Sequence, residues 1–153
     1  MAEQNNQILL ETKDLQKHFP IKDFFGRKKQ AVKAVDGITF QIRKGETFGL
    51  VGESGCGKST LGRTLIRMYE PTGGQIIFDG EDITKLEGAK LQPYHKRMQI
   101  IFQDPYSALD PHHNVEEIIR EPMSLYTNAS KSDIDEQIVE LLKKVGMKAD
   151  DMY

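Results

Sequence analysis

The sequence predicts an α/β fold, and three features of it support that prediction. Apolar and polar residues alternate along 32–42, as in a strand with one buried face. A short apolar run at 47–51 leads into a cluster of glycines, and an apolar stripe at helical spacing follows. Residues 132–145 form the clearest amphipathic helix. A chain of 153 residues with these elements indicates one α/β domain or part of a larger one.

The composition excludes several classes of protein. Hydrophobic residues make up 38% of the chain, which is too many for a disordered protein. The formal net charge of −2 disfavours binding to nucleic acid through bulk positive charge. No apolar run approaches the roughly 20 residues of a membrane span, and residues 1–7 lack the apolar segment of a secretory signal. The single cysteine, Cys56, cannot form an internal disulfide, so a reducing, cytoplasmic setting is expected.

The N-terminal part is expected to consist of strands joined by turns. We predict strands at 8–15, 32–42 and 47–51, the last buried on both faces. Phe19-Pro20 should end the first strand, because proline lacks the N–H that a strand ladder uses. We interpret 22–30 as a solvated loop with a basic cluster at 27–29, for which contact with lipid headgroups or phosphate is the alternative.

The middle of the chain predicts a helix between two strands. The helix is expected at 58–69, with 71–74 as the stop. Residues 75–83 indicate a strand that runs into a turn at Asp79-Gly80. Residues 98–102 indicate another short buried strand.

Two helices are expected in the C-terminal part. The first spans 115–126, and Pro122 should kink or interrupt it. The second spans 132–145, with Ser132 and Asp135 as a capping box and Gly146 as the C-terminal stop.

Residues 52–60, GESGCGKST, match the phosphate-binding pattern G-x-x-x-x-G-K-[ST], with an apolar run before them and a helix after. Glycines allow the chain to approach a phosphate closely, and consecutive N–H groups at a helix start attract anions. The candidate phosphate-binding residues are Gly52, Glu53, Ser54, Gly55, Cys56, Gly57, Lys58, Ser59 and Thr60. The alternative is a glycine-rich turn without a ligand.

Each polar side chain of the pattern has an expected role. Lys58 should reach the β- and γ-phosphates of a nucleotide, Ser59 should bind Mg²⁺, and Thr60 should donate to the α-phosphate. Cys56 either is a reactive thiol beside Lys58 and the helix end or contributes only its backbone. We favour the second interpretation, although a group attached to Cys56 should still block nucleotide entry.

Further motifs surround this pattern at characteristic positions. Gln103 follows Lys58 by 45 positions, within the stretch FQDPYSALDP. Other matching stretches are LQKHF at 15–19, VDGITF at 35–40, RKGET at 43–47 and GLVGESGCGKSTLGR at 49–63. Together they resemble the ATP-binding subunits of ATP-binding cassette (ABC) transporters, in the oligopeptide/dipeptide importer branch, and the F-type subunit more than the D-type. The resemblance extends from about residue 10 to residue 153.

The resemblance implies ATP and Mg²⁺ as cofactors and adds two site residues. Phe19 would stack on adenine, with an ordinary core phenylalanine as the alternative. Gln103 would bring its side-chain oxygen to Mg²⁺ or to the attacking water, with a surface turn as the alternative. Lys58 and Gln103 are thus the catalytic candidates, and Ser59 and Gln103 the metal ligands.

The resemblance also implies partners and a location. Residues 106–123 would contact membrane-spanning permease subunits, and a D-type ATPase subunit would complete a head-to-tail dimer. A peptide-binding protein outside the membrane would be an indirect partner, and nucleic acid would not be one. The expected location is peripheral, on the cytoplasmic face of the cell membrane.

The implied fold is a P-loop NTPase core with an antiparallel β subdomain at about 1–112, followed at 113–153 by the start of the ABC helical subdomain. We expect truncation before the signature loop, because neither that loop, the acidic strand end nor the switch histidine is found. Thr72–Gln75 is interpreted as a turn, and Asp79 precedes Gly80 where the family has its base. His112 and His113 are interpreted as surface residues.

The predicted function is therefore the ATP-binding subunit that energises an oligopeptide/dipeptide importer. This chain is expected to bind Mg-ATP and to hydrolyse little alone, which leaves its classification as an enzyme open. The alternative is a non-catalytic nucleotide-binding or permease-docking regulatory module. A nucleotide kinase or GTPase is disfavoured by Gln103-Asp104-Pro105 and by the absence of the guanine-reading Asn-Lys-x-Asp.

Overall fold

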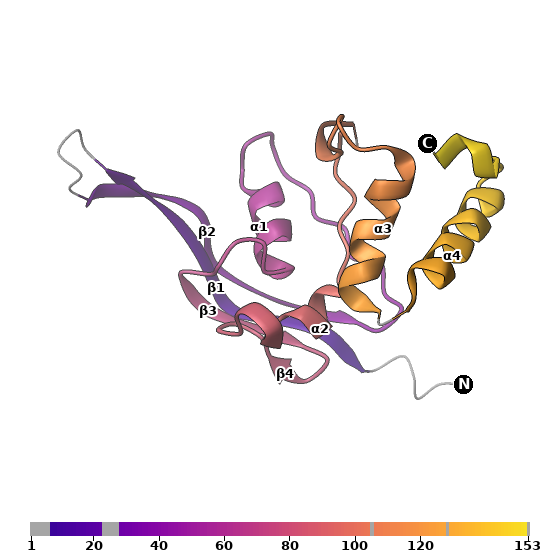
Figure 1. Cartoon of the computed structure of the whole chain (residues 1–153). Coiled ribbons are helices and arrows are strands. Elements are labelled where there is room, and N and C mark those ends of the chain that lie inside the picture. Colours follow the sequence, from indigo (N-terminus) through magenta and orange to yellow (C-terminus); the bar gives the residue numbers. More distant parts are fainter. Residues whose placement is uncertain (1–6, 23–27, 105, 128, 153) are drawn as a thin grey trace. The chain divides into compact units, whose positions relative to one another are not determined.

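The computed structural model describes residues 7–22, 28–104, 106–127 and 129–152. The chain divides into two compact units, Met1–Gln99 and Ile100–Tyr153, and each is described by itself. The first unit holds the sheet and the second holds two helices (Figure 1). The boundary at about 112 between core and helical subdomain stays a prediction.

The sheet of the first unit is antiparallel throughout, with strand order β2-β1-β3-β4. Its strands are β1 (Ile8–Lys22), β2 (Lys28–Arg43), β3 (Gly73–Phe78) and β4 (Glu81–Asp82). The expectation that Phe19-Pro20 ends the first strand is wrong, because β1 continues to Lys22. The ladder between β3 and β1 reaches only to Gln16, so one edge of β1 is open beyond it. A proline at such an edge costs no hydrogen bond to a second neighbour.

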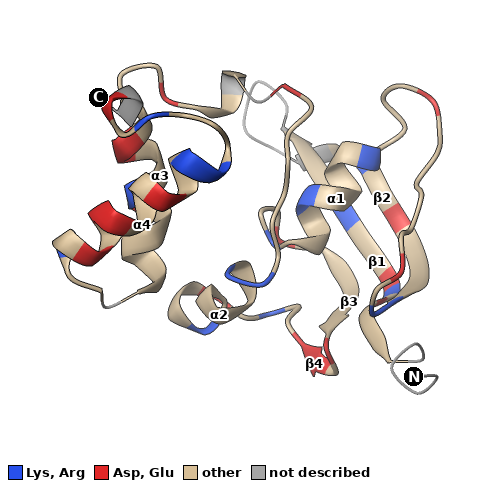
Figure 2. Ribbon diagram, turned by 90° about the vertical axis from the view of Figure 1, so that its right-hand side faces the viewer, with Lys and Arg blue, Asp and Glu red and all other residues tan. Residues whose placement is uncertain are grey.

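The predicted turn at Asp79-Gly80 is confirmed and joins β3 to β4. Both residues have positive φ, 52° and 86°, a combination that suits the twist of a two-residue hairpin. Strand β4, the second strand of this hairpin, consists only of Glu81 and Asp82, which are both acidic (Figure 2). Arg97 holds the turn from outside with its guanidinium 2.5 Å from Asp79 Oδ2.

Helix α1 (Lys58–Leu65) is four residues shorter than the predicted 58–69. Arg67, with φ at 62°, turns the chain out of the helix before Pro71 is reached. Its buried guanidinium donates from Nε to the Ile83 carbonyl at 3.1 Å and from Nη2 to the Leu86 carbonyl at 3.0 Å. These bonds between segments distant in sequence, and not 71–74, fix the end of the helix.

The core of the first unit lies between the sheet and α1. Its buried residues are Leu15, Val35, Leu61, Ile76, Phe78 and Ile83. The predicted strand at 47–51 is absent, and Val51 is 95% exposed. An apolar run forms a buried strand only where other strands pair with it, and the described residues provide no such pairing for this run.

The second unit contains α3 (Val115–Tyr126) and α4 (Lys131–Lys144). The predicted strand at 98–102, which crosses into this unit, is wrong for the same reason as 47–51, and Ile101 is 94% exposed. Helix α3 continues through Pro122 without interruption. The predicted capping box of α4 is displaced: Ser130 and Asp133 form it, two residues before Ser132 and Asp135.

Helices α3 and α4 pack through an apolar face with Ile138 fully buried at its centre. Arg120 on α3 joins them as well, because its guanidinium pairs with Glu116 on its own helix and with Asp135 on α4. The predicted stop at Gly146 is confirmed by its φ of 80°. Among the residues that the structure describes, no helix is long and apolar enough to cross a membrane.

Candidate functional site

The glycine-rich loop between 47–51 and α1 is shaped by contact with β2. Gly57, the residue before the helix, has φ at 98°. A Cβ atom built on Gly57 would lie 2.1 Å from the Ala34 carbonyl oxygen, a distance that no side chain can occupy. Only glycine therefore permits this approach, which places the loop directly against β2.

Lys58 closes the loop with its side chain. Its Nζ donates to the carbonyl oxygens of Gly52 at 2.6 Å and Glu53 at 2.5 Å, and it lies 3.6 Å from Cys56 Sγ. The ammonium group is thus held at the loop by two neutral acceptors. Phosphate oxygens are stronger acceptors for an ammonium group than neutral carbonyls, so an anion in the loop would compete for this cation.

The N-terminal end of α1 lacks a side-chain cap and has no acidic residue in its first turn. The Leu61 N–H makes the first intrahelical bond, to the Gly57 carbonyl at 2.8 Å. The N–H groups of residues 58–60 precede that bond and have no acceptor within the helix. Ser59 is exposed and Thr60 is half-buried at this end of the helix, directly after Lys58 in the sequence.

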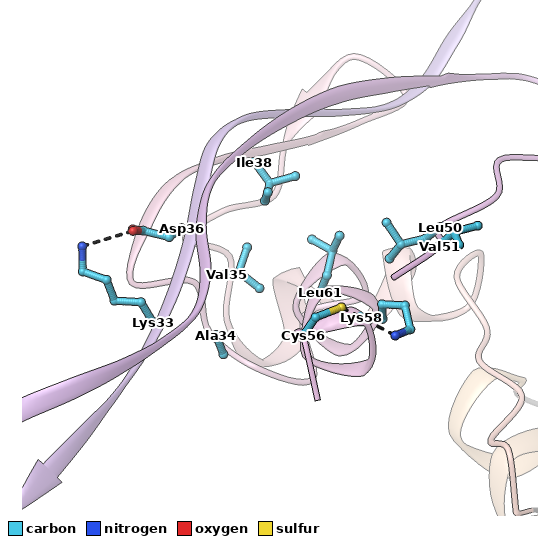
Figure 3. A pocket seen from close by; sticks show the side chains of 11 residues that line it. Lys33, Ala34, Val35, Asp36, Ile38, Leu50, Val51, Cys56, Lys58 and Leu61 are labelled. Atoms are coloured by element: carbon cyan, nitrogen blue, oxygen red, sulfur yellow. Dashed lines mark hydrogen bonds and ion pairs between the residues drawn. The ribbon is translucent and has the colours of Figure 1, made fainter. Parts of the chain in front are cut away.

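A pocket of about 280 Å³ adjoins the loop (Figure 3). Side chains from β2, the segment before the loop and α1 converge on it, including Val35, Leu50 and Leu61. Lys33 and Asp36 also line it and pair at 3.1 Å, while His18 Nε2 lies 2.8 Å from the other Asp36 oxygen. The Lys33 ammonium, and after it the His18 ring, holds the pKa of Asp36 below its ordinary value.

The structure brings together the candidates at 52–60 in the first unit but does not place Phe19, which was added by resemblance, in the pocket beside them. Phe19 is not among the residues that line the pocket. Its ring meets Tyr69 edge-on, with centroids 5.6 Å apart, and the Lys17 ammonium lies 5.0 Å from its centroid. Gln103 is exposed and belongs to the second unit. The roles proposed for both residues stay predictions.

Other acidic residues considered in the sequence analysis contribute to the fold rather than to the loop. Asp79, dismissed as a base from the sequence, forms the ion pair with Arg97. Among the described residues, no group of three or more His, Cys, Asp or Glu is arranged to hold a metal ion. The sequence reasoning missed Lys33 and Asp36, although both lie in or beside the strand pattern that leads to the loop. Their position on a strand next to a phosphate-binding motif is the signal that could have identified them.

Together, these features identify the class of the chain as a P-loop protein. Beside the sheet, a glycine-rich loop and the uncapped start of a helix surround one lysine. The ABC transporter family model matches residues 35–152. The chain therefore belongs to the ABC transporter family, which confirms the resemblance seen in the sequence.

Relatives and solved structures agree with this assignment. The chain is 47% identical over 149 residues to the oligopeptide transport ATP-binding protein AppF of Bacillus subtilis (strain 168), covering 96% of this chain and 45% of AppF. It is 40% identical over 144 residues to the dipeptide transport ATP-binding protein DppF of Escherichia coli (strain K12), covering 94% of this chain and 43% of DppF. The chain thus spans less than half the length of these relatives.

The fold is similar to that of the ATP-binding cassette MJ0796, solved as a dimer in a post-hydrolysis state bound to ADP and Pi. The TM-score is 0.74 at 21% sequence identity, covering 94% of this chain and 60% of MJ0796. This likeness shows the ABC cassette fold, and the antiparallel sheet predicted from the sequence is present in the first unit.

Proposed function

We propose that this chain is the Mg-ATP-binding part of an ABC importer of oligopeptides or dipeptides. The observation that supports it most is the geometry at the start of α1, where the helix has no side-chain cap and the Lys58 ammonium is held by loop carbonyls. On binding, Lys58 exchanges the carbonyls of Gly52 and Glu53 for β- and γ-phosphate oxygens. Ser59 binds Mg²⁺ and Thr60 donates to the α-phosphate.

Two further residues complete the proposed nucleotide site. Phe19 stacks on adenine once its ring leaves the edge contact with Tyr69. Gln103 brings its side-chain oxygen to Mg²⁺ or to the attacking water. The exposure of Gln103 is compatible with such a role, because its side chain is accessible to a ligand.

The transport role rests on the names of the relatives, which are oligopeptide and dipeptide transport ATP-binding proteins. By analogy we propose permease subunits as partners, contacted through residues 106–123, and a D-type ATPase subunit in a head-to-tail dimer. An extracytoplasmic peptide-binding protein is then an indirect partner. The corresponding location is the cytoplasmic face of the membrane, and hydrolysis by these residues alone is expected to be slow.

The test is ATP binding by the purified chain, measured by isothermal titration with and without Mg²⁺. Lys58→Ala should weaken ATP binding at least tenfold, because a charge-assisted contact to phosphate is worth about 1.5–3 kcal/mol. Lys85→Ala, which removes an exposed lysine outside the loop, is the control and should bind as the wild type does. Ser59→Ala should abolish most of the gain in affinity from Mg²⁺. Equal affinity in the Lys58 variant and the wild type would contradict the proposal.

A further inference from the structure

The ring of Phe19 is held by two side chains of the first unit. Tyr69, in the segment that follows α1, meets it edge-on, with the ring centroids 5.6 Å apart and the ring planes at 88°. Lys17 lies two positions before Phe19 on β1. Its ammonium is 5.0 Å from the Phe19 centroid and 5.8 Å from the Tyr69 centroid. We call Lys17, Phe19 and Tyr69 the aromatic cluster.

Two members of the aromatic cluster are anchored to other parts of the unit. Lys17 Nζ donates to the Glu70 carbonyl at 2.7 Å. The Tyr69 N–H donates to the Arg63 carbonyl at 3.2 Å, and Arg63 Nη1 donates to the Tyr69 hydroxyl at 3.4 Å. Tyr69 is thus tied to α1, and Lys17 to the segment that follows this helix.

Phe19 is the member of the cluster with the most freedom to move. Among the described residues, the buried core of the first unit and the apolar side chains packed on it do not include Phe19. The ladder between β1 and β3 ends at Gln16, before Phe19 is reached. Its partner on β2, Val32, is 52% exposed, and Ile21 is 47% exposed. The ring can therefore change rotamer without opening the core.

The resting contacts of Phe19 compete with base stacking. A purine stacks on the face of an aromatic ring, whereas the Lys17 ammonium lies over the Phe19 ring and Tyr69 meets it almost at a right angle. In this arrangement Phe19 is not among the residues that line the pocket beside the loop. The ring therefore leaves the cluster when it stacks on a base whose phosphates occupy the loop. The apparent dissociation constant of the nucleotide is then the intrinsic one divided by the fraction of molecules whose ring is free.

We propose that Tyr69 and Lys17 are positioning residues that hold Phe19 away from the base and so set how much adenine contributes to ATP affinity. This inference rests on the nucleotide site proposed above and adds two residues to it. The phosphates bind at 52–60, so the cost of freeing Phe19 applies to a nucleotide but not to a bare phosphate chain. The ratio of the two affinities therefore reports on the cluster separately from the loop.

The test compares ATP with inorganic tripolyphosphate, each titrated with Mg²⁺ into the purified chain and followed by calorimetry. Tyr69→Ala should bind ATP about fivefold more tightly than the wild type, because the edge-on aromatic contact is lost from the resting state. Its affinity for tripolyphosphate should be unchanged. Tyr69→Phe keeps the ring and should bind both compounds as the wild type does. A variant that merely damages the fold would bind both more weakly.

Lys17→Met is the second variant. It keeps an unbranched side chain but removes the cation over Phe19, so the ratio of ATP affinity to tripolyphosphate affinity should rise about threefold. This ratio cancels any general effect of the lost charge on anion binding. Lys13→Met is the matched control on the same strand, because Lys13 pairs with Glu11 at 3.6 Å and not with the cluster. Its affinity ratio should equal that of the wild type.

A double variant shows whether the effect passes through Phe19. Phe19→Ala should bind ATP about fivefold more weakly than the wild type and tripolyphosphate equally well, because a stacking contact is lost. In Phe19→Ala, Tyr69→Ala the second substitution should add no ATP affinity, since no ring is left to hold.

Far-ultraviolet circular dichroism of every variant shows that each is folded, and Lys17→Met carries the test if Tyr69→Ala does not fold. ATP affinity in Tyr69→Ala at or below that of the wild type, or a gain shared by tripolyphosphate, would overturn the inference and leave the nucleotide site in place. A gain that persists in the double variant would overturn it too, because Phe19 would not be involved. A folded wild type that binds neither ATP nor tripolyphosphate would overturn the nucleotide site itself, and this inference with it.

Discussion

The two ends of helix α1 are built in opposite ways. At the N-terminal end no side chain caps the helix, and the lysine beside it rests on neutral carbonyls. At the C-terminal end the Arg67 guanidinium is buried and donates to two carbonyls of another segment. The N-terminal end leaves polar groups available to a ligand. At the C-terminal end the polar groups of Arg67 fix the helix in the fold. The Arg67 bonds hold the C-terminal end of the helix in the fold, while the N-terminal end keeps polar groups without a side-chain partner.

The largest expected effect comes from removing the close approach at the N-terminal end. Gly57→Ala should lower the free energy of unfolding by about 3 kcal/mol or more, because the added Cβ would lie 2.1 Å from the Ala34 carbonyl oxygen. It should also abolish ATP binding. Urea unfolding measures the stability loss, and titration calorimetry measures the binding.

Gly62→Ala is the matched control for that substitution. A Cβ on Gly62 meets nothing within 4 Å, so this variant should be up to about 1 kcal/mol more stable than the wild type through helix propensity. If Gly57→Ala were as stable as Gly62→Ala, the loop could not lie against β2 as described.

The next effect is at the C-terminal end. Arg67→Ala should lower the free energy of unfolding by about 1–3 kcal/mol, because the carbonyls of Ile83 and Leu86 lose their donors. Part of this loss of stability is offset, because the variant also removes Arg67 Nη1, which is buried without a hydrogen-bond partner among the described residues. Arg43→Ala, which truncates an exposed arginine, should change stability little.

Arg67→Gly sharpens this prediction. Glycine adopts the φ of 62° without strain, so the glycine variant should be about 1 kcal/mol more stable than the alanine variant. Urea unfolding of both variants separates the backbone strain from the lost hydrogen bonds. Equal stability of the two would show that the positive φ has no cost.

How far the sequence predicts this molecule depends on where each interaction partner lies. The turn at Asp79-Gly80 and the loop at 52–60 were predicted because their residue types set the local backbone. The end of α1 was misplaced because Arg67 adopts its conformation through bonds to Ile83 and Leu86, which no local pattern reveals.

The errors elsewhere have the same origin. The apolar runs at 47–51 and 98–102 have strand composition, but pairing with other strands decides whether a strand forms. The capping box of α4 was ambiguous because Ser130–Asp133 and Ser132–Asp135 both fit the spacing.

A smaller effect is expected for Cys56. Its Sγ lies 3.6 Å from Lys58 Nζ, and a Cβ on Gly52 would lie only 2.8 Å from that sulfur. Alkylation should therefore fill the loop and block ATP binding, whereas Cys56→Ser should change ATP affinity less than threefold, about 0.6 kcal/mol. Calorimetry on the alkylated chain measures the blocked ATP binding. The Cys56→Ser chain treated with the same alkylating reagent is the control. Full ATP binding after complete alkylation would contradict the geometry.

The smallest effect concerns acid stability at the pocket. Lys33 and then His18 hold the pKa of Asp36 below its ordinary 3.8, so the unfolded chain binds this proton at a higher pH than the folded chain does. The stabilisation is complete above pH 3.8 and is lost as the pH falls through the lower folded pKa. Asp36→Asn should therefore flatten the acid limb of a plot of urea midpoint against pH. The effect is confined to the region below pH 3.8, and because Asp36 is exposed, solvent screening keeps it small. An unchanged acid limb in the asparagine variant would mean that this pair does not contribute to stability.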